Sequence, residues 1–421
     1  MYDTIVIGGG PAGSTAATLL ARQGFSVLLL ERERFPRFQI GESLLPYNND
    51  LFDRLGVTDK LVSGDFHPKF GAYFVTGDGS VGYSFRFDRT LPEPYTRSFQ
   101  VKRSEFDAML LRHAAASGVT VREETPVAAV DLSDPNRAVV RTLIGEELEA
   151  RFVIDASGHT SIVGSRVGDR ADIASLKKIA VFAHYRNVPR APGRDAGNTV
   201  IVVLRDAWFW MIPITADLMS VGLVVDREHI TRCGLDPDEL LEATIAETPY
   251  VADLMQRAER ASQVYVRKDF SYRMRNLAGP NFALIGDAAG FLDPIFSTGV
   301  FMAMSSADLA ASAIAKRLQS GSMRALERYE RELTCAMGKY FRFIDQFYRR
   351  EFLEVLMQPT DKWGLLQTII GIFGGDIFVR RDNRLKIALF FALVKIQKWR
   401  GGIAPRIAWD SLPAASRMEA T

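Results

Sequence analysis

The first 31 residues constrain the fold more than any other part of the chain. An apolar strand pattern at 4–7 leads into a glycine-rich turn, an Ala/Leu-rich helix follows to Gln23, and a second apolar strand ends at Glu31. The turn has the spacing G-x-G-x-x-G, which permits a tight turn, close approach of a pyrophosphate and close packing of helix on strand. The helix N-terminus then faces the phosphates, and a carboxylate after the second strand is placed to accept from ribose hydroxyls. We therefore expect a dinucleotide-binding βαβ unit with cofactor contacts from Gly8, Gly10, Pro11, Ala12, Gly13, Glu31 and Arg32.

A second stretch, "FALIGDAAGFLDPIFSTGVFMAM", repeats this logic late in the chain. A strand at 282–285 ends in Gly286 and Asp287, and a turn containing Pro294 and Gly299 leads into a long Ala-rich helix. An aspartate at such a strand end can bind a polyol hydroxyl, and the N-terminus of the helix can stabilise an anion. The two stretches together predict one nucleotide site built from both ends of the sequence.

This pairing resembles the FAD-dependent monooxygenase superfamily. The resemblance implies that Asp287 contacts the ribityl chain of FAD and that Asp293 and Pro294 lie beside the isoalloxazine. Two further motifs match in chain order: "RSEFD", whose Arg103 approaches FAD in that superfamily, and "DASG", which contains Asp155 and Gly158. No second G-x-G-x-x-G and no C-x-x-C pair is present, which argues against a disulfide reductase with two dinucleotides. FAD is therefore the expected cofactor, and no metal is expected.

Three motifs are similar to those of the flavin-dependent halogenases within that superfamily. "GESLLP" places Glu42 and the FAD-contacting Ser43 in a strap next to the flavin, "AWFWMIP" has the W-x-W-x-I-P pattern with Trp208 and Trp210, and "HPKFGAYFV" places Lys69 in a K-x-G-x-x-F context. The resemblance implies catalytic roles for Lys69, Glu42 and the two tryptophans. Without it, "AWFWMIP" is equally well a strand buried on both faces, and Lys69 is one of 52 basic residues, most of which face water.

The implied chemistry explains why these parts occur together. Reduced FAD and O2 form a C4a-hydroperoxide, which oxidises halide to hypohalous acid. Backbone N–H groups of Ser297, Thr298 and Gly299, at the start of the last long helix of this domain, would hold the halide. A buried Lys69, with its pKa depressed by desolvation, would guide the acid to an aromatic ring. The two indoles would separate the flavin from a chamber lined by aromatic residues, for which the candidates are Phe70, Phe74, Tyr83, Phe85 and Phe87.

The substrate is narrowed by two departures from the tryptophan-acting members of the family. Phe296 stands where those enzymes have a glutamate before the "STG" turn, and the chain is shorter than theirs. We therefore expect a phenol or pyrrole, free or tethered to an acyl or peptidyl carrier protein, with a separate flavin reductase as partner. The alternatives are an FAD-dependent monooxygenase or a geranylgeranyl-reductase-like enzyme that acts on a lipid-like substrate without halide, and a flavin-binding protein that is not an enzyme.

Composition limits the remaining possibilities. A formal charge of +2 gives no reason to expect nucleic acid, and two cysteines far apart offer no disulfide framework, which favours a cytoplasmic location. No leader pattern precedes the first strand, and no uncharged apolar run approaches the ~20 residues needed to cross a bilayer.

The fold class that these patterns predict is α/β: a Rossmann-type FAD-binding domain, a mixed β-sheet substrate layer and a C-terminal helical region. We predict that residues 1–60, 100–178 and 277–320 form the first, 61–99 with 179–276 the second, and 321–421 the third together with a tail. The C-terminal region contains "KYFRFIDQFYRREF" and the cationic apolar "LKIALFFALVKIQKW". Either it is a cap on the FAD domain, or it presents an amphipathic face to a membrane surface or a carrier protein.

Overall fold

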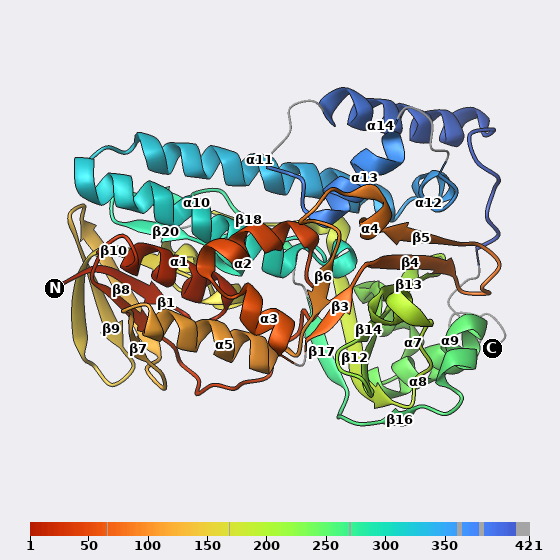
Figure 1. Cartoon of the computed structure of the whole chain (residues 1–421), viewed down its shortest axis with the longest axis horizontal. Coiled ribbons are helices and arrows are strands. Elements are labelled where there is room, and N and C mark those ends of the chain that lie inside the picture. Colours follow the sequence, from red (N-terminus) through yellow and green to blue (C-terminus); the bar gives the residue numbers. More distant parts are fainter. Residues whose placement is uncertain (65, 168, 269–270, 360–363, 379–382, 410–421) are drawn as a thin grey trace.

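A computed structural model describes residues 1–409 except 65, 168, 269–270, 360–363 and 379–382 (Figure 1). The expected tail therefore lies partly outside the described residues, because 410–421 are not among them. The predicted α/β fold is confirmed: two eight-stranded sheets form the centre of the molecule, and helices cover them.

The first sheet has the order β19-β20-β10-β1-β2-β7, with β9 pairing β10 and β8 pairing β9. Its central strands are parallel, so that β1 lies between β2 and β10, and their carboxyl ends share one edge. The strands are β1 (Tyr2–Ile7), β2 (Val27–Leu30), β7 (Thr120–Arg122), β8 (Val127–Asp134), β9 (Arg137–Thr142), β10 (Glu147–Asp155), β19 (Ala278–Gly279) and β20 (Phe282–Leu284).

Three helices pack on this sheet because their sequences are rich in small apolar residues. Helix α1 (Pro11–Ala21) lies between α5 (Arg103–Ala116) and α10 (Thr298–Ser320) and ends two residues before the predicted Gln23. Helix α10 is long and apolar enough to cross a membrane by length and composition alone. It packs against α1 and α11 (Arg324–Phe347), and residues such as Ala307 and Ala310 are fully buried, as expected for a core helix.

The second sheet carries the tryptophan pair. Its order is β16-β12-β15-β14-β13-β4-β5, with β17 pairing β12, and only β13 and β4 run parallel. Both faces of β14 are buried, as the sequence predicts. Trp208 and Trp210 point into the large core shared with the first sheet, whereas Phe209 and Met211 point into a smaller core on the opposite face. The strands are β4 (Gly71–Thr76), β5 (Gly82–Arg86), β12 (Lys178–Arg186), β13 (Thr199–Val203), β14 (Ala207–Pro213), β15 (Leu218–Asp226), β16 (Glu259–Arg260) and β17 (Tyr265–Lys268).

Smaller elements connect these layers. They are β3 (His67–Lys69), β6 (Ser98–Gln100), β11 (Arg170–Asp172), β18 (Tyr272–Met274), β21 (Gly290–Phe291), α2 (Asn49–Leu55), α3 (Thr58–Ser63), α4 (Phe87–Thr90), α6 (Gly164–Val167), α7 (Arg227–Cys233), α8 (Pro237–Glu247) and α9 (Pro249–Met255). After α11 the chain forms α12 (Arg350–Met357), α13 (Leu365–Gly374) and α14 (Asn383–Arg400). Helices α12 and α13 lie beside β5, with α14 beyond them (Figure 1), so the helical region contacts the second sheet as well as the first domain. The three-part domain division stays a prediction.

Candidate active site

The glycine turn after β1 is closely packed at its first and last glycines and is open at Gly10. Gly8 has φ +106°, and a Cβ there would lie 2.3 Å from the Ala156 carbonyl oxygen. A Cβ on Gly13 would lie 1.9 Å from the carbonyl oxygen of Gly8, so α1 approaches β1 as closely as only glycine allows. A Cβ on Gly10 would meet only an Arg37 nitrogen at 3.4 Å. The turn therefore leaves space for a ligand in front of Gly10, at the N-terminus of α1.

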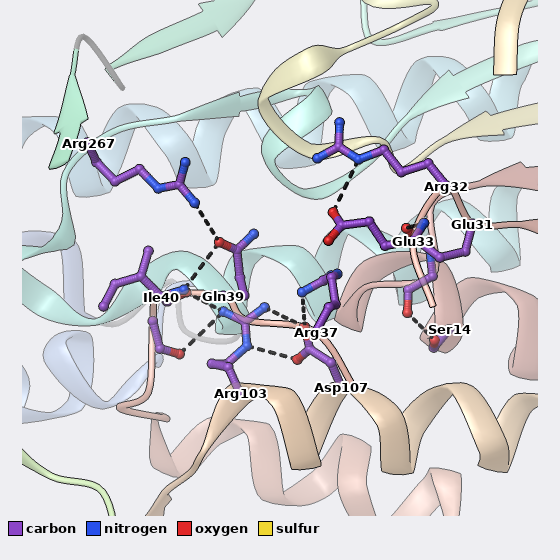
Figure 2. Close-up of polar contacts among 12 residues, drawn as sticks. Ser14, Glu31, Arg32, Glu33, Arg37, Gln39, Ile40, Arg103, Asp107 and Arg267 are labelled. Carbon is purple, nitrogen blue, oxygen red and sulfur yellow. Dashed lines mark hydrogen bonds and ion pairs between the residues drawn. The ribbon is translucent and has the colours of Figure 1, made fainter. Parts of the chain in front are cut away.

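Glu31 fixes this turn. Its buried carboxylate accepts the Gly9 N–H at 2.6 Å and the Glu33 N–H at 2.9 Å. Each carboxylate oxygen has a second lone pair, so the predicted contact with ribose hydroxyls stays open to it. Arg32, in contrast, points to solvent with a side chain 62% exposed and pairs with Glu33 (Figure 2). Its predicted contact with FAD stays a prediction.

Two arginines share one fully buried aspartate behind the turn (Figure 2). Arg103 donates to both oxygens of Asp107, at 2.8 and 2.9 Å, and Arg37 Nη1 lies 3.2 Å from Asp107 Oδ2. Burial disfavours the charge of Arg103, but the surrounding carboxylates, Asp107 first and then Asp287 and Glu42, more than offset this, and the pKa of the guanidinium is raised. The two guanidiniums thus place charged hydrogen-bond donors beside the open glycine turn, which suits a pyrophosphate.

The sequence motifs did not single out Arg37. It lies between Glu31 and "GESLLP" in the chain, and only its position between Asp107 and Gly10 indicates a role. The same cluster holds the strap, because Arg103 Nη1 donates to the Ile40 carbonyl at 2.6 Å. A Cβ on Gly41, which has φ +106°, would lie 2.9 Å from this nitrogen.

The "DASG" segment forms a second turn at the same edge. Asp155 is fully buried and accepts the N–H groups of Ser157 at 3.0 Å and Val163 at 2.7 Å. Burial raises the pKa of its carboxyl. These bonds shape the turn that contains Gly158, which has φ +68° and where a Cβ would meet no atom within 4 Å. Asp155 therefore acts on this site through the backbone that it holds.

The third turn follows β20. Gly286 has φ +58°, and a Cβ there would lie 3.0 Å from the Ala12 Cβ, so this turn packs directly on the start of α1. The Asp287 carboxylate is about one third exposed and lies 3.6 Å from His159 Nε2. The turns after β1, β10 and β20 and the Glu31 carboxylate thus meet at one sheet edge, where open doubly wound sheets bind nucleotides. Their open glycines, exposed carboxylate and paired guanidiniums fit FAD.

A buried hydrogen-bond chain joins the expected flavin edge to the tryptophan strand. Asp293 Oδ1 accepts the Ile295 N–H at 3.0 Å, Tyr348 donates its hydroxyl to Asp293 Oδ2 at 2.8 Å, and Trp208 Nε1 donates to Tyr348 Oη at 3.1 Å. Lys178 Nζ lies 3.8 Å from the centre of the Tyr348 ring. Burial raises the pKa of Asp293 to about 6, although Ile295 and Tyr348 oppose the rise. Tyr348 had no signal in the sequence, because it follows α11, 55 residues from Asp293.

Lys69 is buried, with only 2% of its surface exposed. Strand β3 pairs with β6, and the ammonium donates to Ser43 Oγ at 2.8 Å and to the Leu44 carbonyl at 3.1 Å. No carboxylate pairs with it among the described residues, and burial lowers its pKa from 10.5 to about 7. The predicted burial of Lys69 is confirmed, and the solvated alternative is wrong.

Lys69 and Ser297 line one pocket. Ser297 has φ +56° and precedes α10, whose first N–H groups have no acceptor within the helix. Phe296, in the position of the missing glutamate, lines the same pocket and stacks on Phe373 at 4.2 Å. The remaining lining residues are Leu45, Ala72, Phe74, Phe85, Phe87, Thr199, Ile201, Ile295 and Ile370, so three of the five aromatic candidates line it and Phe70 and Tyr83 do not.

The two indoles stand behind this pocket and do not line it. Their ring centres are 5.9 Å apart, and Trp208 contacts Phe347, which in turn contacts Phe296. Trp210 donates to Ser220 Oγ at 3.1 Å and covers Gly222, where a Cβ would lie 2.1 Å from the indole. Thr298 and Gly299 are likewise outside the lining. The separating role of the tryptophans and the halide role of these amides stay predictions.

Glu42 is buried beside His184, a neighbour that the sequence motifs did not indicate. Its Oε2 accepts the Gly41 N–H at 3.1 Å, and its Oε1 lies 3.6 Å from His184 Nε2. Neither Glu42 Oε1 nor His184 Nε2 has a hydrogen-bond partner among the described residues. The strap therefore holds a carboxylate with one free oxygen next to an imidazole, and its catalytic role stays a prediction.

Comparisons with known proteins show the family of this chain. A model of the tryptophan halogenase family matches residues 3–96 and 84–352. The chain is 30% identical over 404 residues to a 1H-pyrrole-2-carbonyl-(peptidyl-carrier protein) chlorinase of Pseudomonas fluorescens, covering 90% of each protein. It is 35% identical over 353 residues to a tryptophan 2-halogenase of Chondromyces crocatus, covering 80% of this chain and 66% of that protein.

Two solved structures share the whole fold. The flavin-dependent brominase Bmp2 superposes with a TM-score of 0.85 at 28% identity, over 94% of this chain and 99% of that one. The myxobacterial chondrochloren halogenase CndH gives a TM-score of 0.78 at 34% identity, over 95% and 90%. The chain therefore belongs to the tryptophan halogenase family of flavin-dependent halogenases. It is an FAD-dependent enzyme, and the alternative without halide is not favoured.

Proposed function

We propose that this halogenase modifies an electron-rich aromatic ring, a phenol or a pyrrole, that is carried on an acyl or peptidyl carrier protein. The observation that carries the proposal is the pocket itself, in which Lys69 is the single charged residue among mostly aromatic and aliphatic side chains. Such a lining suits a neutral aromatic ring, which needs no counter-charge. The pyrrole-carrier chlorinase, which this chain matches over 90% of each protein, supports a tethered ring.

A tethered substrate needs an apolar path to the surface. A second pocket lies between α12, α13 and α14 and shares Phe85 with the first. It is lined mainly by aliphatic residues, among them Leu366, Ile369 and Leu393. The two pockets are neighbours because both are lined by Phe85. In this proposal, the extended arm that joins the ring to the carrier protein passes through the second pocket to reach Lys69.

In this proposal, Lys69 binds the hypohalous acid. Reduced FAD, supplied by a separate flavin reductase, provides with O2 the oxidising power that converts halide to hypohalous acid. A neutral Lys69 amine then holds the acid by a hydrogen bond next to the ring, and the pKa of about 7 leaves a large neutral fraction at neutral pH. The Ser43 hydroxyl and the Leu44 carbonyl orient the amine, and the apolar wall excludes water.

Mass spectrometry tests the proposal. The enzyme receives reduced FAD from a flavin reductase, O2, bromide and either a carrier-bound pyrrole or the free pyrrole acid. We expect a bromine mass shift on the carrier-bound ring, little on the free acid, and none with Lys69→Ala, which should still bind FAD. Preferred turnover of a free ring would refute the carrier, and full activity of Lys69→Ala would refute the role of the lysine.

A further inference from the structure

Helix α14 has two opposite apolar faces, and only one of them packs on the protein. Phe390, Phe391 and Val394 are buried, and the two phenylalanines contact Phe343 of α11 with ring centres 6.3 and 4.9 Å away. Gln397 is also buried and binds Glu354 of α12 at 2.7 Å. These contacts fix the orientation of the helix. Figure 1 shows α14 at the outside of the molecule, beyond α12 and α13.

The opposite face carries a continuous apolar stripe. Leu385, Leu389, Ala392, Ile396 and Trp399 recur at steps of four and three residues, which places them on one side of a helix about 21 Å long between the first and the last. Leu385 and Trp399 are 83% and 85% exposed. The described residues include nine exposed large hydrophobic side chains, and four of them belong to this stripe. Single exposed apolar residues are ordinary, but a gathered patch marks an interaction surface.

Cationic side chains border the stripe on both sides, and the helix has no acidic residue. At about 100° per residue, Arg384 and Lys395 fall on one side of the stripe, and Lys386 and Arg400 on the other. Lys398 lies 3.7 Å from Glu351 of α12, and this is the one ion pair of the helix among the described residues. The surface therefore combines apolar area with an excess of positive charge.

We propose that α14 binds the surface of a membrane that contains anionic lipids. The stripe runs along one straight helix, as a planar interface requires, and ends in an exposed tryptophan, whose amphipathic ring suits the headgroup level. Lysine and arginine on both flanks can extend their apolar stems along the acyl boundary and place their charges at lipid phosphates. An acidic protein or a second copy of the chain would instead offer a surface that is not planar. Binding of either one to the stripe is the result that would contradict the proposal.

The experiment uses the full-length FAD-loaded enzyme and vesicles of phosphatidylcholine, with and without phosphatidylglycerol. We expect sedimentation with the anionic vesicles that falls with added salt. Leu385→Ser with Trp399→Ser should reduce binding at least about tenfold. Lys395→Ala and Arg400→Ala should each reduce binding to anionic vesicles about fivefold, as expected for one cation near such a surface.

The chain offers a matched control. Leu143 and Ile144, in the turn between β9 and β10, are 71% and 84% exposed, so Leu143→Ser with Ile144→Ser removes similar apolar area elsewhere and should leave binding unchanged. Bound FAD verifies folding of every variant. The proposal is overturned if wild-type enzyme does not bind anionic vesicles, if the two double variants bind alike, or if the stripe instead mediates a dimer or the binding of an acidic carrier protein. Failure to bind vesicles, or equal binding by the two double variants, does not bear on whether a carrier-bound ring is halogenated, which the mass-spectrometric experiment decides.

Discussion

Replacement of Lys69 by methionine should make the protein without FAD more stable at low pH. The side chain is buried and has no carboxylate partner among the described residues, and burial lowers the pKa of the ammonium from 10.5 to about 7. At about 1.4 kcal/mol per pKa unit, this difference costs the folded state about 5 kcal/mol when the amine is charged. Methionine fills a similar volume but leaves the Leu44 carbonyl without a donor, which offsets about 1–2 kcal/mol.

The sign of the pH dependence follows from the two pKa values. Below pH 7 the amine is charged in both the folded and the unfolded state, so the wild type bears the full cost. Between pH 7 and 10.5 the unfolded state binds more protons, and wild-type stability rises with pH until the cost is gone. We therefore expect Lys69→Met to gain about 3 kcal/mol at pH 6 and close to nothing at pH 9.5.

Thermal unfolding followed by circular dichroism measures this difference. For a chain of 421 residues, about 3 kcal/mol corresponds to a rise in Tm of roughly 3 °C. Lys178→Met is the control: Lys178 is also buried, but it pairs with Asp226 at 2.8 Å, so its loss leaves a carboxylate unpaired and should not stabilise the fold. A Lys69→Met protein that is less stable than wild type at pH 6, or that gains equally at both pH values, would refute the reasoning.

Three further predictions concern the cofactor edge and the pocket. Arg37→Gln should weaken FAD binding about 10- to 100-fold in a fluorescence titration, because it removes a charged donor whose side chain is only 12% exposed, whereas exposed Arg32→Gln should change it little. Equal effects of the two substitutions would contradict this assignment. Tyr348→Phe removes a hydrogen bond that lowers the pKa of Asp293, so that pKa should rise above about 6. The acid limb of the pH–activity profile should then move to higher pH, and an unchanged acid limb would show that ionisation of Asp293 does not control the reaction. Phe296→Ala should destabilise the protein by about 3–5 kcal/mol in chemical unfolding, since it empties a buried ring position stacked on Phe373, and a loss below about 1 kcal/mol would indicate that the pocket closes around the smaller residue.

Local sequence determined the parts of this protein that depend on short-range geometry. The βαβ unit is readable because G-x-G-x-x-G encodes a single tight turn between a strand and a helix, and the structure places Gly8, Gly13 and Glu31 within that unit. Alternation likewise determined the two faces of β14, so the sequence predicts that Trp208 and Trp210 share a face. The motifs after β10 and β20 were readable for the same reason, since each follows directly from the strand before it.

Tertiary structure alone decided which distant residues meet. Arg37 and Arg103 share Asp107 because the segment that leads from Arg37 into the strap folds back over α5. Tyr348 reaches Asp293 because α11 runs back along the first domain. Burial of Lys69 depends on β3 pairing with β6 and on walls from the second sheet and α13, none of which a K-x-G pattern encodes. The indoles lie behind the pocket lining because long-range packing places other rings in front of them: Trp208 contacts Phe347, and Phe347 contacts Phe296, which lines the pocket. Side-chain periodicity specifies which face a residue is on, whereas the layer that covers this face is set by long-range packing.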